Sequence, residues 1–370
     1  GVAYEVGDTM RLPDLGRTLA RIRDRGHDGF YHGETARLLV AEMERGGGLI
    51  TFEDLRRYQA VEREPVRGTY RGYGVISMPP PSSGGIAVIE MLNILEGYDL
   101  AAMGHNTAPY LHHLAEAMRR AYRDRATFVA DPDFEDVPVA RLTDKGYAAR
   151  LRRDIDPHAA TPSSPADVRV AGEGDQTTHY SVVDGEGLAV ATTYTLEYGY
   201  GSRIVVPGAG FLLNNEMDDF AARPGEPNQF GLVQGEANAV EPGKRMLSAM
   251  TPTILLAPDG GVRLVTGSPG GPTIISTVTQ MISNVVDWEM ELPEAHAAPR
   301  LHHQHLPDVL RYERGGARAG IIVVCIGETT QWRRVEIVEL VDAQPFDVEV
   351  IIVNNNSTDN TLEIAQAAAE

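Results

Sequence analysis

Residues 176–181 contain the residue types of a nucleophilic site. They read Gln-Thr-Thr-His-Tyr-Ser and open a β-branched run typical of one half of a hairpin. A second run, 188–195, follows a glycine-rich turn around Glu186. If the turn is centred there, facing residues have numbers that add to 372. We therefore expect Thr177 to face Thr195 across the ladder, close enough for their hydroxyls to touch.

A threonine hydroxyl attacks a carbonyl only when a base lies beside it. One such base is the residue's own free α-amine, whose pKa near ~8 lets it take the hydroxyl proton at neutral pH. That amine exists at Thr177 only if the bond to Gln176 is cut. Residues 161–176 are rich in Pro, Ser, Ala, Gly and charge, as expected of a surface loop that leads to a cut. A threonine-rich edge strand without catalysis is the alternative.

The elements that would hold this hairpin follow from apolar spacing. Residues 11–160 favour helices, among them 12–25 and 34–45, with a strand pair at 65–77. Strands then prevail at 202–206, 210–214, 253–257 and 262–266, before a helix at 272–287. This order indicates a layered α+β fold. Near residue 316 the pattern changes to a strand at 321–325, a helix at 332–341 and a strand at 348–353, which is a βαβ unit.

The composition excludes several classes of protein. The chain has 370 residues and a net charge of −19, which argues against nucleic acid or an anionic membrane as partner. No apolar run approaches the ~20 residues of a spanning helix. Cys325 is the single cysteine, so no intrachain disulfide and no cysteine metal site is expected. The sequence opens at Gly1 in mid-pattern, without a signal peptide, and we expect it to lack its natural N-terminus.

Four motifs together resemble the γ-glutamyltranspeptidases, which are N-terminal nucleophile hydrolases. They are Ser-Met-Pro-Pro-Pro-Ser-Ser-Gly-Gly at 77–85, Thr-Thr-His-Tyr at 177–180, Leu-Asn-Asn-Glu-Met-Asp-Asp-Phe at 213–220 and Thr-Gly-Ser-Pro-Gly-Gly at 266–271. The resemblance covers about residues 5–316. It implies a layered αββα fold, here truncated on its N-terminal side, and no cofactor or metal.

The resemblance also implies a reaction. The precursor cuts itself between Gln176 and Thr177, and the new Thr177 attacks a γ-glutamyl amide such as glutathione to form an acyl-enzyme. Water, an amino acid or a peptide then releases the acyl group, and the large and small fragments stay associated. Thr195 is expected to bond to the nucleophile, and the Gly270-Gly271 turn to supply N–H groups to the tetrahedral intermediate. A plain tight turn is the alternative for the two glycines.

Recognition of the zwitterionic glutamyl head requires anions for its ammonium and donors for its carboxylate. By resemblance, Asp219 and Glu197 face the ammonium with Glu216 nearby, and Ser248 donates to the carboxylate. A solvated acidic turn is the alternative at 216–219. Phe230 falls where the family has a lid over the substrate, or it is a buried loop anchor.

The chain also departs from the family. Ala249 replaces the second serine of a Ser-Ser pair, which removes one donor to the carboxylate. By the resemblance, we expect the family's carboxylate-binding arginine and core strands to lie in the N-terminal part that this sequence lacks, and the last strands of the small subunit to be absent as well, because the likeness stops near Gly316. The division implied is 1–176 from the large subunit, 177–316 as the small catalytic subunit, and 317–370 as a βαβ fragment.

Residues 319–370 resemble the opening of a family 2 glycosyltransferase. The segment 348–361 carries this likeness, but Asn354 stands where an acidic residue is usual and the metal-binding motif is absent. A fusion or gene rearrangement fits better than a second working enzyme.

Three rival hypotheses remain beside the γ-glutamyl enzyme: a cephalosporin or glutaryl acylase, a truncated non-catalytic chimera, and a glycosyltransferase fragment. The family implies a periplasmic or secreted location. Two further features are interpreted as structural: the histidines of 302–305, which lack the carboxylate spacing of a metal site, and the Pro-rich 79–85 turn, where an anion site at the helix start is the alternative.

Overall fold

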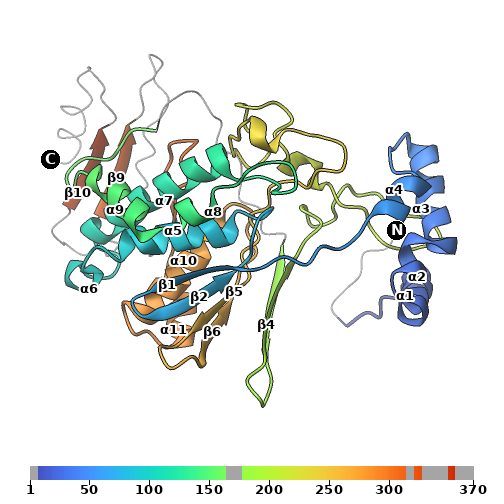
Figure 1. The fold of residues 1–370 in the computed structure, drawn as a ribbon, viewed down its shortest axis with the longest axis horizontal. Helices are drawn as coiled ribbons and strands as arrows, with labels where there is room; N and C mark the ends of the chain where they lie inside the picture. The colour runs from blue at the N-terminus through green and yellow to red at the C-terminus, as the bar shows by residue number, and fades with distance from the viewer. Residues whose placement is uncertain (1–6, 164–176, 314–320, 327–348, 355–370) are drawn as a thin grey trace. The chain divides into compact units, whose positions relative to one another are not determined.

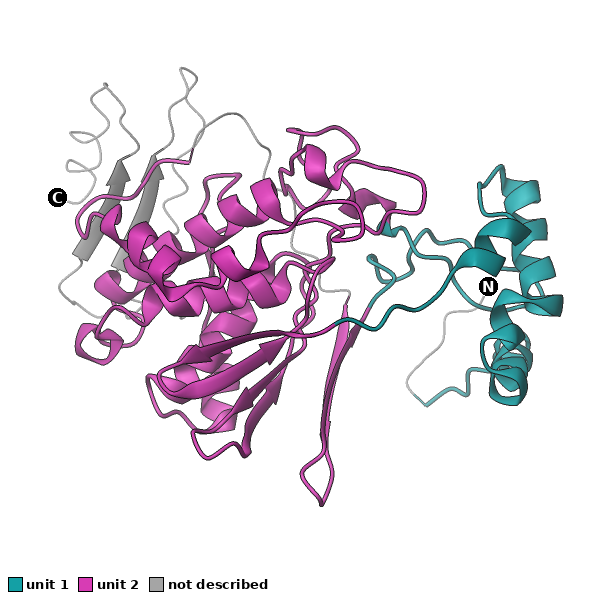
Figure 2. Ribbon diagram, in the orientation of Figure 1, with its two compact units in different colours: residues 1–63, 195–216 teal, residues 64–194, 217–370 magenta. Residues whose placement is uncertain are grey.

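The computed structural model describes residues 7–163, 177–313, 321–326 and 349–354. The chain divides into two compact units (Figure 2). The first consists of residues 1–63 and 195–216, and the second of residues 64–194 and 217–370. These two units are defined by how the chain packs. The division expected from the sequence is instead defined by the proposed cut between Gln176 and Thr177.

Helices prevail before residue 160, apart from β1 and β2, and most strands follow residue 177 (Figure 1). The helices are α1 (Pro13–Arg25), α2 (Asp28–Tyr31), α3 (Gly33–Gly46), α4 (Phe52–Arg57), α5 (Gly84–Leu95), α6 (Leu100–Met103), α7 (Ala108–Phe128), α8 (Val139–Leu142), α9 (Lys145–Arg153), α10 (Thr273–Val286) and α11 (Leu292–Ala297), with 3₁₀ turns η1 (Glu216–Asp219) and η2 (Glu236–Asn238). The strands are β1 (Val66–Tyr70), β2 (Tyr73–Ser77), β3 (Thr178–Val183), β4 (Ala189–Tyr194), β5 (Thr253–Leu256), β6 (Val262–Thr266), β7 (Leu301–His302), β8 (Arg311–Tyr312), β9 (Ile321–Ile326) and β10 (Glu349–Asn354).

The first unit packs α3 against the loop 195–216. Four apolar side chains of α3 form a small core with Val206 and Ala209; these are Ala36, Leu39, Val40 and Met43. The Thr18 hydroxyl of α1 donates to the Ala209 carbonyl at 2.8 Å and fastens the loop to the helices.

The strands predicted at 202–206 and 210–214 are wrong as regular strands. The two arms do pair, since the Leu213 amide donates to the Ile204 carbonyl at 2.9 Å, but only one isolated bridge forms. Arg203 has φ +63° and Gly201 has φ +51°, values that interrupt an extended backbone. The loop is therefore irregular although its composition is typical of strands.

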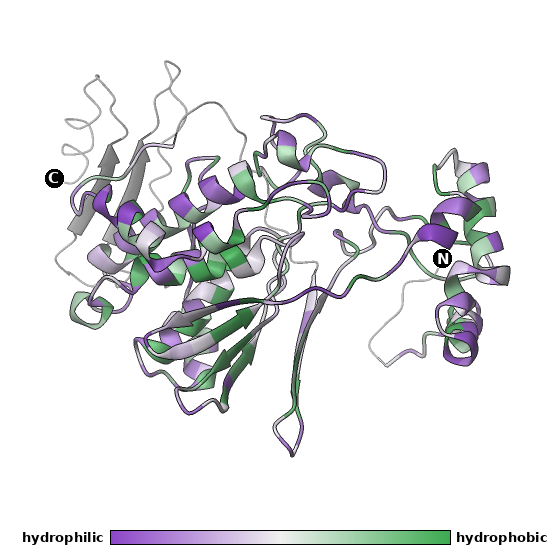
Figure 3. Cartoon of the chain, viewed as in Figure 1, coloured by the Kyte–Doolittle hydropathy of each residue, from purple (hydrophilic) through white to green (hydrophobic). Residues whose placement is uncertain are grey.

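The second unit is built on an antiparallel sheet in the order β1-β2-β5-β6. Helix α5 packs on β1 and β2, and α7 and α10 pack on α5. Every residue of α5 is buried, which explains why its sequence is apolar nearly all round (Figure 3). The strand pair predicted at 65–77 and the helix start after the Pro-rich 79–85 turn are confirmed.

The hairpin β3–β4 has the register predicted from the sequence. Thr178 pairs with Tyr194 and Val183 with Ala189, so facing residues have numbers that add to 372. The turn is longer than the three residues expected, because the strands end at Val183 and Ala189 and five residues, 184–188, form the connection. The hairpin packs against β5 and β6 of the sheet.

Strands β9 and β10 pair in parallel, with Ile321 opposite Glu349. The two strands lie at the positions expected for the strands of the predicted βαβ unit. The helix expected at 332–341 lies outside the described residues.

The start of α5 requires glycine because the backbone of another segment lies against it. A Cβ added at Gly84 would lie 2.7 Å from the Met250 carbonyl oxygen and 2.2 Å from the Thr251 hydroxyl. A Cβ at Gly85 would lie 2.4 Å from the Met78 carbonyl oxygen. The two glycines thus allow the Pro-rich turn to touch residues 248–251.

We predict that Gly84→Ala lowers the free energy of unfolding by about 1–3 kcal/mol, since the new methyl group overpacks a backbone contact. Gly16→Ala is the control, because Gly16 lies near the start of α1 with nothing within 4 Å of its added Cβ. The control should be stabilised by about 0.5–1 kcal/mol. Chemical denaturation measures both, and equal effects in the two variants would contradict the contact.

Candidate active site

The strand that follows Thr177 is fixed to β6 by the ring of His179. A Cβ added at Gly267 would lie 2.2 Å from the His179 Nδ1 atom, so the imidazole covers the glycine backbone. Ser181, on the same face of β3, donates its hydroxyl to the Val265 carbonyl at 3.1 Å. Gly267 directly precedes the Ser-Pro-Gly-Gly turn. The predicted nucleophile and the predicted oxyanion turn therefore lie on two segments held together by this contact.

His179 is a neutral member of a directed hydrogen-bond chain. Because the Ser181 hydroxyl donates to Val265, it accepts from the His179 Nε2–H at 3.0 Å. The Nδ1 atom then accepts from the Thr193 hydroxyl at 2.8 Å. Burial lowers the pKa of His179, which agrees with this neutral tautomer. The chain joins β3, β4 and β6 without a buried charge.

Gly270 and Gly271 form a turn that L-residues other than glycine rarely adopt, with φ +124° and +55°. The turn leads into α10, and the Thr273 amide and hydroxyl both donate to the Gly270 carbonyl. An oxyanion at this turn would lie near the N-terminus of a 14-residue helix, where the helix dipole favours negative charge.

Phe230 lies against this turn. A Cβ added at Gly271 would be 3.4 Å from the ring, and the side chain is only 7% exposed. The Phe230 carbonyl accepts from Gln304 Nε2 at 3.1 Å. Of the two interpretations, these contacts agree with a buried loop anchor.

Asp219 is partly buried, and its pKa is raised to about 7. Burial is the main cause; Arg125 opposes it and Asp218 adds to it. Arg125 belongs to α7 and is 2% exposed, with its Nε donating to the Ser83 hydroxyl at 2.8 Å. Burial lowers the pKa of Arg125, and the charge of Asp219 opposes that shift. The two side chains are thus an electrostatically coupled pair.

One buried amide positions two of the predicted substrate-binding residues. Asn238 is 1% exposed; its Nδ2 donates to the Asp219 carbonyl at 2.7 Å, and its Oδ1 accepts from the Leu247 amide at 3.0 Å. Leu247 directly precedes Ser248. Asn238 therefore sets the spacing between Asp219 and Ser248.

The Pro-rich turn supports Ser248 from the other side. Ser83 donates both its amide and its hydroxyl to the Ser248 carbonyl, at 2.9 and 2.8 Å. The Ser248 amide donates back to the Pro81 carbonyl at 3.0 Å. This agrees with the interpretation of 79–85 as a rigid entry turn and adds a reason for its two serines.

Three of the predicted site residues belong to the first unit. The Glu197 amide donates to the Thr195 hydroxyl oxygen at 2.8 Å, and the Glu197 carboxylate accepts from Asn215 Nδ2. Glu197 has φ +73° and is 5% exposed. Glu216 is 8% exposed, with its amide donating to Asn214 Oδ1 at 3.1 Å. Burial of Glu216 does not fit a solvated acidic turn.

Sequence reasoning missed Arg125 and Asn238. Neither lies in a motif, and their partners are distant in the chain, so spacing carried no signal for them. The serines at 82 and 83 did lie in a motif, but their acceptor could not be read from it.

The histidine segment is bonded within the core. His302 Nδ1 contacts the Ser276 hydroxyl at 2.8 Å and its Nε2 contacts Gln304 Oε1 at 3.0 Å. Within the part of the chain that the structure describes, one cluster of three potential metal ligands was found: the exposed His27, Asp28 and His32 of the first unit.

The sequence profile of the family described as Gamma-glutamyltranspeptidase matches residues 1–323. The chain belongs to the γ-glutamyltranspeptidase family. Similarity to this family thus begins before, and ends beyond, the residues 5–316 expected from the motifs. The match says nothing of a glycosyltransferase.

Curated relatives carry two kinds of name. The chain is 51% identical over 319 residues to the glutathione hydrolase proenzyme of Escherichia coli (strain K12), covering 85% of this chain and 54% of the relative. It is 40% identical over 301 residues to the acylase ACY 1 proenzyme of Pseudomonas sp. (strain SE83), covering 81% and 52%. The chain therefore spans about half the length of the curated relatives it matches.

Among solved structures, cephalosporin acylase from Bacillus halodurans superimposes with a TM-score of 0.68 at 29% identity, covering 81% of this chain and 52% of that one. The mixed helix-and-sheet fold is thus shared within the family. Among the described residues, no helix is both long and apolar enough to cross a membrane.

The raised pKa of Asp219 predicts a pH-dependent stability. The pKa is about 7 in the folded chain and ~4 when unfolded, so the folded state holds the proton more tightly. This tighter proton binding stabilises the folded state fully below pH ~4, and the stabilisation is lost as the pH rises through 7.

Relative to Asp219→Asn, the wild-type free energy of unfolding should fall by roughly 2 kcal/mol between pH 5 and 8. The control is Asp259→Asn, because Asp259 is exposed. Urea denaturation at each pH gives the comparison. A difference between wild type and Asp219→Asn that is constant with pH would contradict the shift.

Proposed function

We propose that this chain is the catalytic portion of a γ-glutamyl hydrolase and transferase that matures by cutting the bond between Gln176 and Thr177. The observation that carries the proposal is the packing of His179 over Gly267. It supports a site in which the strand after Thr177 and the Gly270-Gly271 turn approach each other.

In the first step the Thr177 hydroxyl passes its proton to the Thr177 α-amine, and Oγ1 attacks the γ-carbonyl carbon of the donor. The carbonyl oxygen becomes an oxyanion, which accepts hydrogen bonds from the amides of Gly270 and Gly271. The C–N bond then breaks, and the leaving amine takes the proton from the ammonium. The product is an ester between Thr177 and the glutamyl group.

In the second step water or an acceptor amine attacks the ester and restores the threonine. Maturation uses the same oxygen: Thr177 Oγ1 attacks the carbonyl carbon of Gln176, and the peptide C–N bond breaks as its nitrogen takes up the hydroxyl proton and becomes the Thr177 amine. Water then hydrolyses the resulting ester. Thr195 is proposed to bond to the nucleophile. A Thr177–Thr195 contact would extend the register of the hairpin by one residue beyond the Thr178–Tyr194 pair.

The glutamyl head is proposed to bind through its two charges. Asp219, Glu197 and Glu216 receive the ammonium, and Ser248 donates to the carboxylate. The support from Asn238 and Ser83 favours this role for Asp219 and Ser248, because both are held by buried hydrogen bonds. Phe230 is proposed to back the oxyanion turn.

The two fragments are proposed to remain associated after the cut. The ladder between β2 and β5 joins a strand from residues before 177 to one after it, and α10 packs on α5 across the same boundary. From the family, we propose glutathione as donor and water, an amino acid or a peptide as acceptor. The proposed location is periplasmic or secreted. The proposed fold of the whole protein has four layers, αββα. Residues 317–370 are proposed as an inactive glycosyltransferase-like fragment, supported by the parallel pairing of β9 and β10.

A cephalosporin or glutaryl acylase is the second candidate, favoured by the likeness to ACY 1 and to the Bacillus halodurans structure. The γ-glutamyl enzyme and the acylase differ in whether their donor carries an ammonium group, which the acidic residues would bind. Faster turnover of a γ-glutamyl anilide than of a glutaryl anilide supports the first function, and the reverse order supports the acylase.

Thr177→Ala should abolish both maturation and amide turnover, because it removes the hydroxyl oxygen that attacks the carbonyl carbon in both proposed reactions. Incubated at neutral pH, the wild type should yield a smaller fragment whose N-terminal sequence is Thr-Thr-His-Tyr, and the variant should stay intact. Gel electrophoresis, N-terminal sequencing and the anilide assay measure these outcomes. Continued scission in the variant would eliminate Thr177 as nucleophile.

Gly267→Ala should slow maturation and turnover by about tenfold or more, because its methyl group displaces the His179 ring and with it the strand after Thr177. Gly185→Ala, in the turn of the same hairpin, adds a methyl group with nothing within 4 Å and should leave both rates unchanged. If the two variants behave alike, the contact between His179 and Gly267 does not position the nucleophile.

A further inference from the structure

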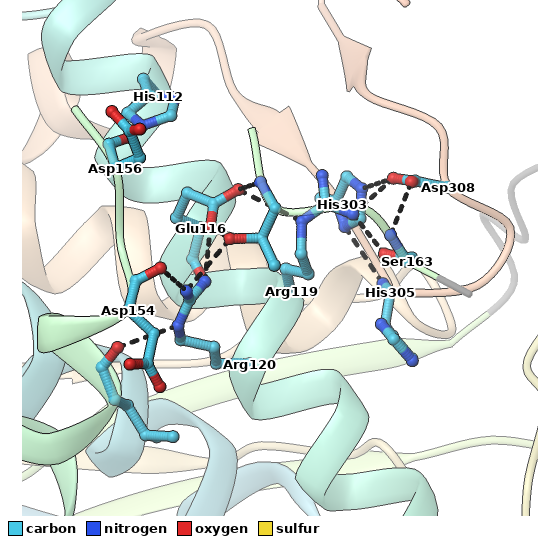
Figure 4. A network of polar contacts seen from close by, with 12 residues as sticks. His112, Glu116, Arg119, Arg120, Asp154, Asp156, Ser163, His303, His305 and Asp308 are labelled. Atoms are coloured by element: carbon cyan, nitrogen blue, oxygen red, sulfur yellow. Dashed lines mark hydrogen bonds and ion pairs between the residues drawn. The ribbon is translucent and has the colours of Figure 1, made fainter. Parts of the chain in front are cut away.

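A buried ionic network holds the chain just ahead of the proposed cleavage loop (Figure 4). The Thr161 amide and hydroxyl both donate to the Glu116 carboxylate, at 3.0 and 2.6 Å. Glu116 is 1% exposed and also accepts from Arg119 and Arg120, on the next turn of α7. Arg120 donates in turn to the Thr161 hydroxyl at 3.1 Å.

The second half of the network lies beyond β7. The Ser163 amide donates to Asp308 Oδ2 at 2.9 Å, while Arg119 donates to both the Ser163 hydroxyl and Asp308 Oδ1. His303 Nε2–H donates to Asp308 Oδ1 at 2.9 Å, and His303 Nδ1 accepts from the His305 amide. His303 is therefore a neutral donor.

The charges of this network balance. Two carboxylates, Glu116 and Asp308, face two guanidinium groups, Arg119 and Arg120. Burial alone would raise the pKa of Asp308, but His303, Arg119 and the Ser163 amide hold it below its usual range. Paired and multiply hydrogen-bonded charges of this kind hold one geometry, and removing one partner strands the other.

The network connects the two sides of the Gln176–Thr177 bond. Glu116, Arg119 and Ser163 precede that bond, whereas His303 and Asp308 follow it. Residues 161–163 are the last described residues before the loop. Ser163 is bonded to Asp308 and therefore fixes where the loop begins relative to the part of the chain that starts at Thr177.

We propose that Glu116, Arg119 and Asp308 form an anchor that positions the Gln176–Thr177 bond for self-cleavage by fixing residues 161–163. After the cut, the same contacts hold the end of the large fragment on the small fragment. This inference rests on the proposed maturation, and Asp308 acts in it as a positioning residue.

The first measurement does not depend on cleavage. In the uncut Thr177→Ala chain, hydrogen exchange followed by mass spectrometry should show protection of the Thr161 and Ser163 amides; Pro162 has none. Adding Asp308→Asn should speed exchange of the Ser163 amide by about tenfold, because this amide loses a charged acceptor. Arg123→Gln is the matched control on α7, since Arg123 pairs with the neighbouring Asp124 and not with the anchor; it should leave exchange unchanged. Unchanged exchange in Asp308→Asn overturns the anchor.

The second measurement is the rate at which the fragment beginning at Thr177 forms. Asp308→Asn should slow it by about tenfold, Asp308→Glu should recover part of the rate, and Arg123→Gln should match wild type. Thermal melting of the uncut chains separates a positioning effect from general destabilisation. A cleavage rate that only follows the melting temperature across all variants overturns the positioning role. Cleavage of Asp308→Asn at the wild-type rate overturns it as well. If the wild type stays uncut, maturation itself fails, and the exchange result alone decides the anchor.

Discussion

A histidine ring placed over a glycine is the contact on which the candidate site depends. Thr177 begins the hairpin β3–β4, which is otherwise largely exposed, and a two-stranded hairpin has little stability of its own. His179 and Ser181 bind it to β6 through a neutral hydrogen-bond chain and a backbone approach that only Gly267 permits. Strand β6 leads directly into the Gly270-Gly271 turn, so one contact positions both segments of the candidate site.

The charged residues of the second unit are held by neutral ones. Asn238 donates to the backbone carbonyl of Asp219, and Ser83 donates to the backbone carbonyl of Ser248, so neither contact uses the Asp219 or Ser248 side chain. Burial raises the pKa of Asp219, and an incoming ammonium would lower it again by Coulomb attraction. An acidic residue kept at this cost in the folded state is typical of a binding site.

The proposed cut separates segments of the chain that share one sheet. Strands β1 and β2 precede the cut and β5 and β6 follow it, yet all four form one antiparallel sheet. The ionic network at Asp308 crosses the same boundary at a second place. Breaking one peptide bond at the proposed place would therefore leave the hydrogen bonds of the sheet intact, and these bonds would hold the two fragments together.

The sequence by itself determined the local elements and the register of the hairpin, because period-2 and helical spacing and the glycine-rich turn are short-range signals. It misjudged residues 202–214, where backbone at positive φ interrupts a strand-like composition. Only the tertiary structure showed Arg125 near Asp219, Asn238 between Asp219 and Ser248, and Asp308 on Ser163. Each of these contacts joins residues far apart in the chain, and no periodicity records such a pairing.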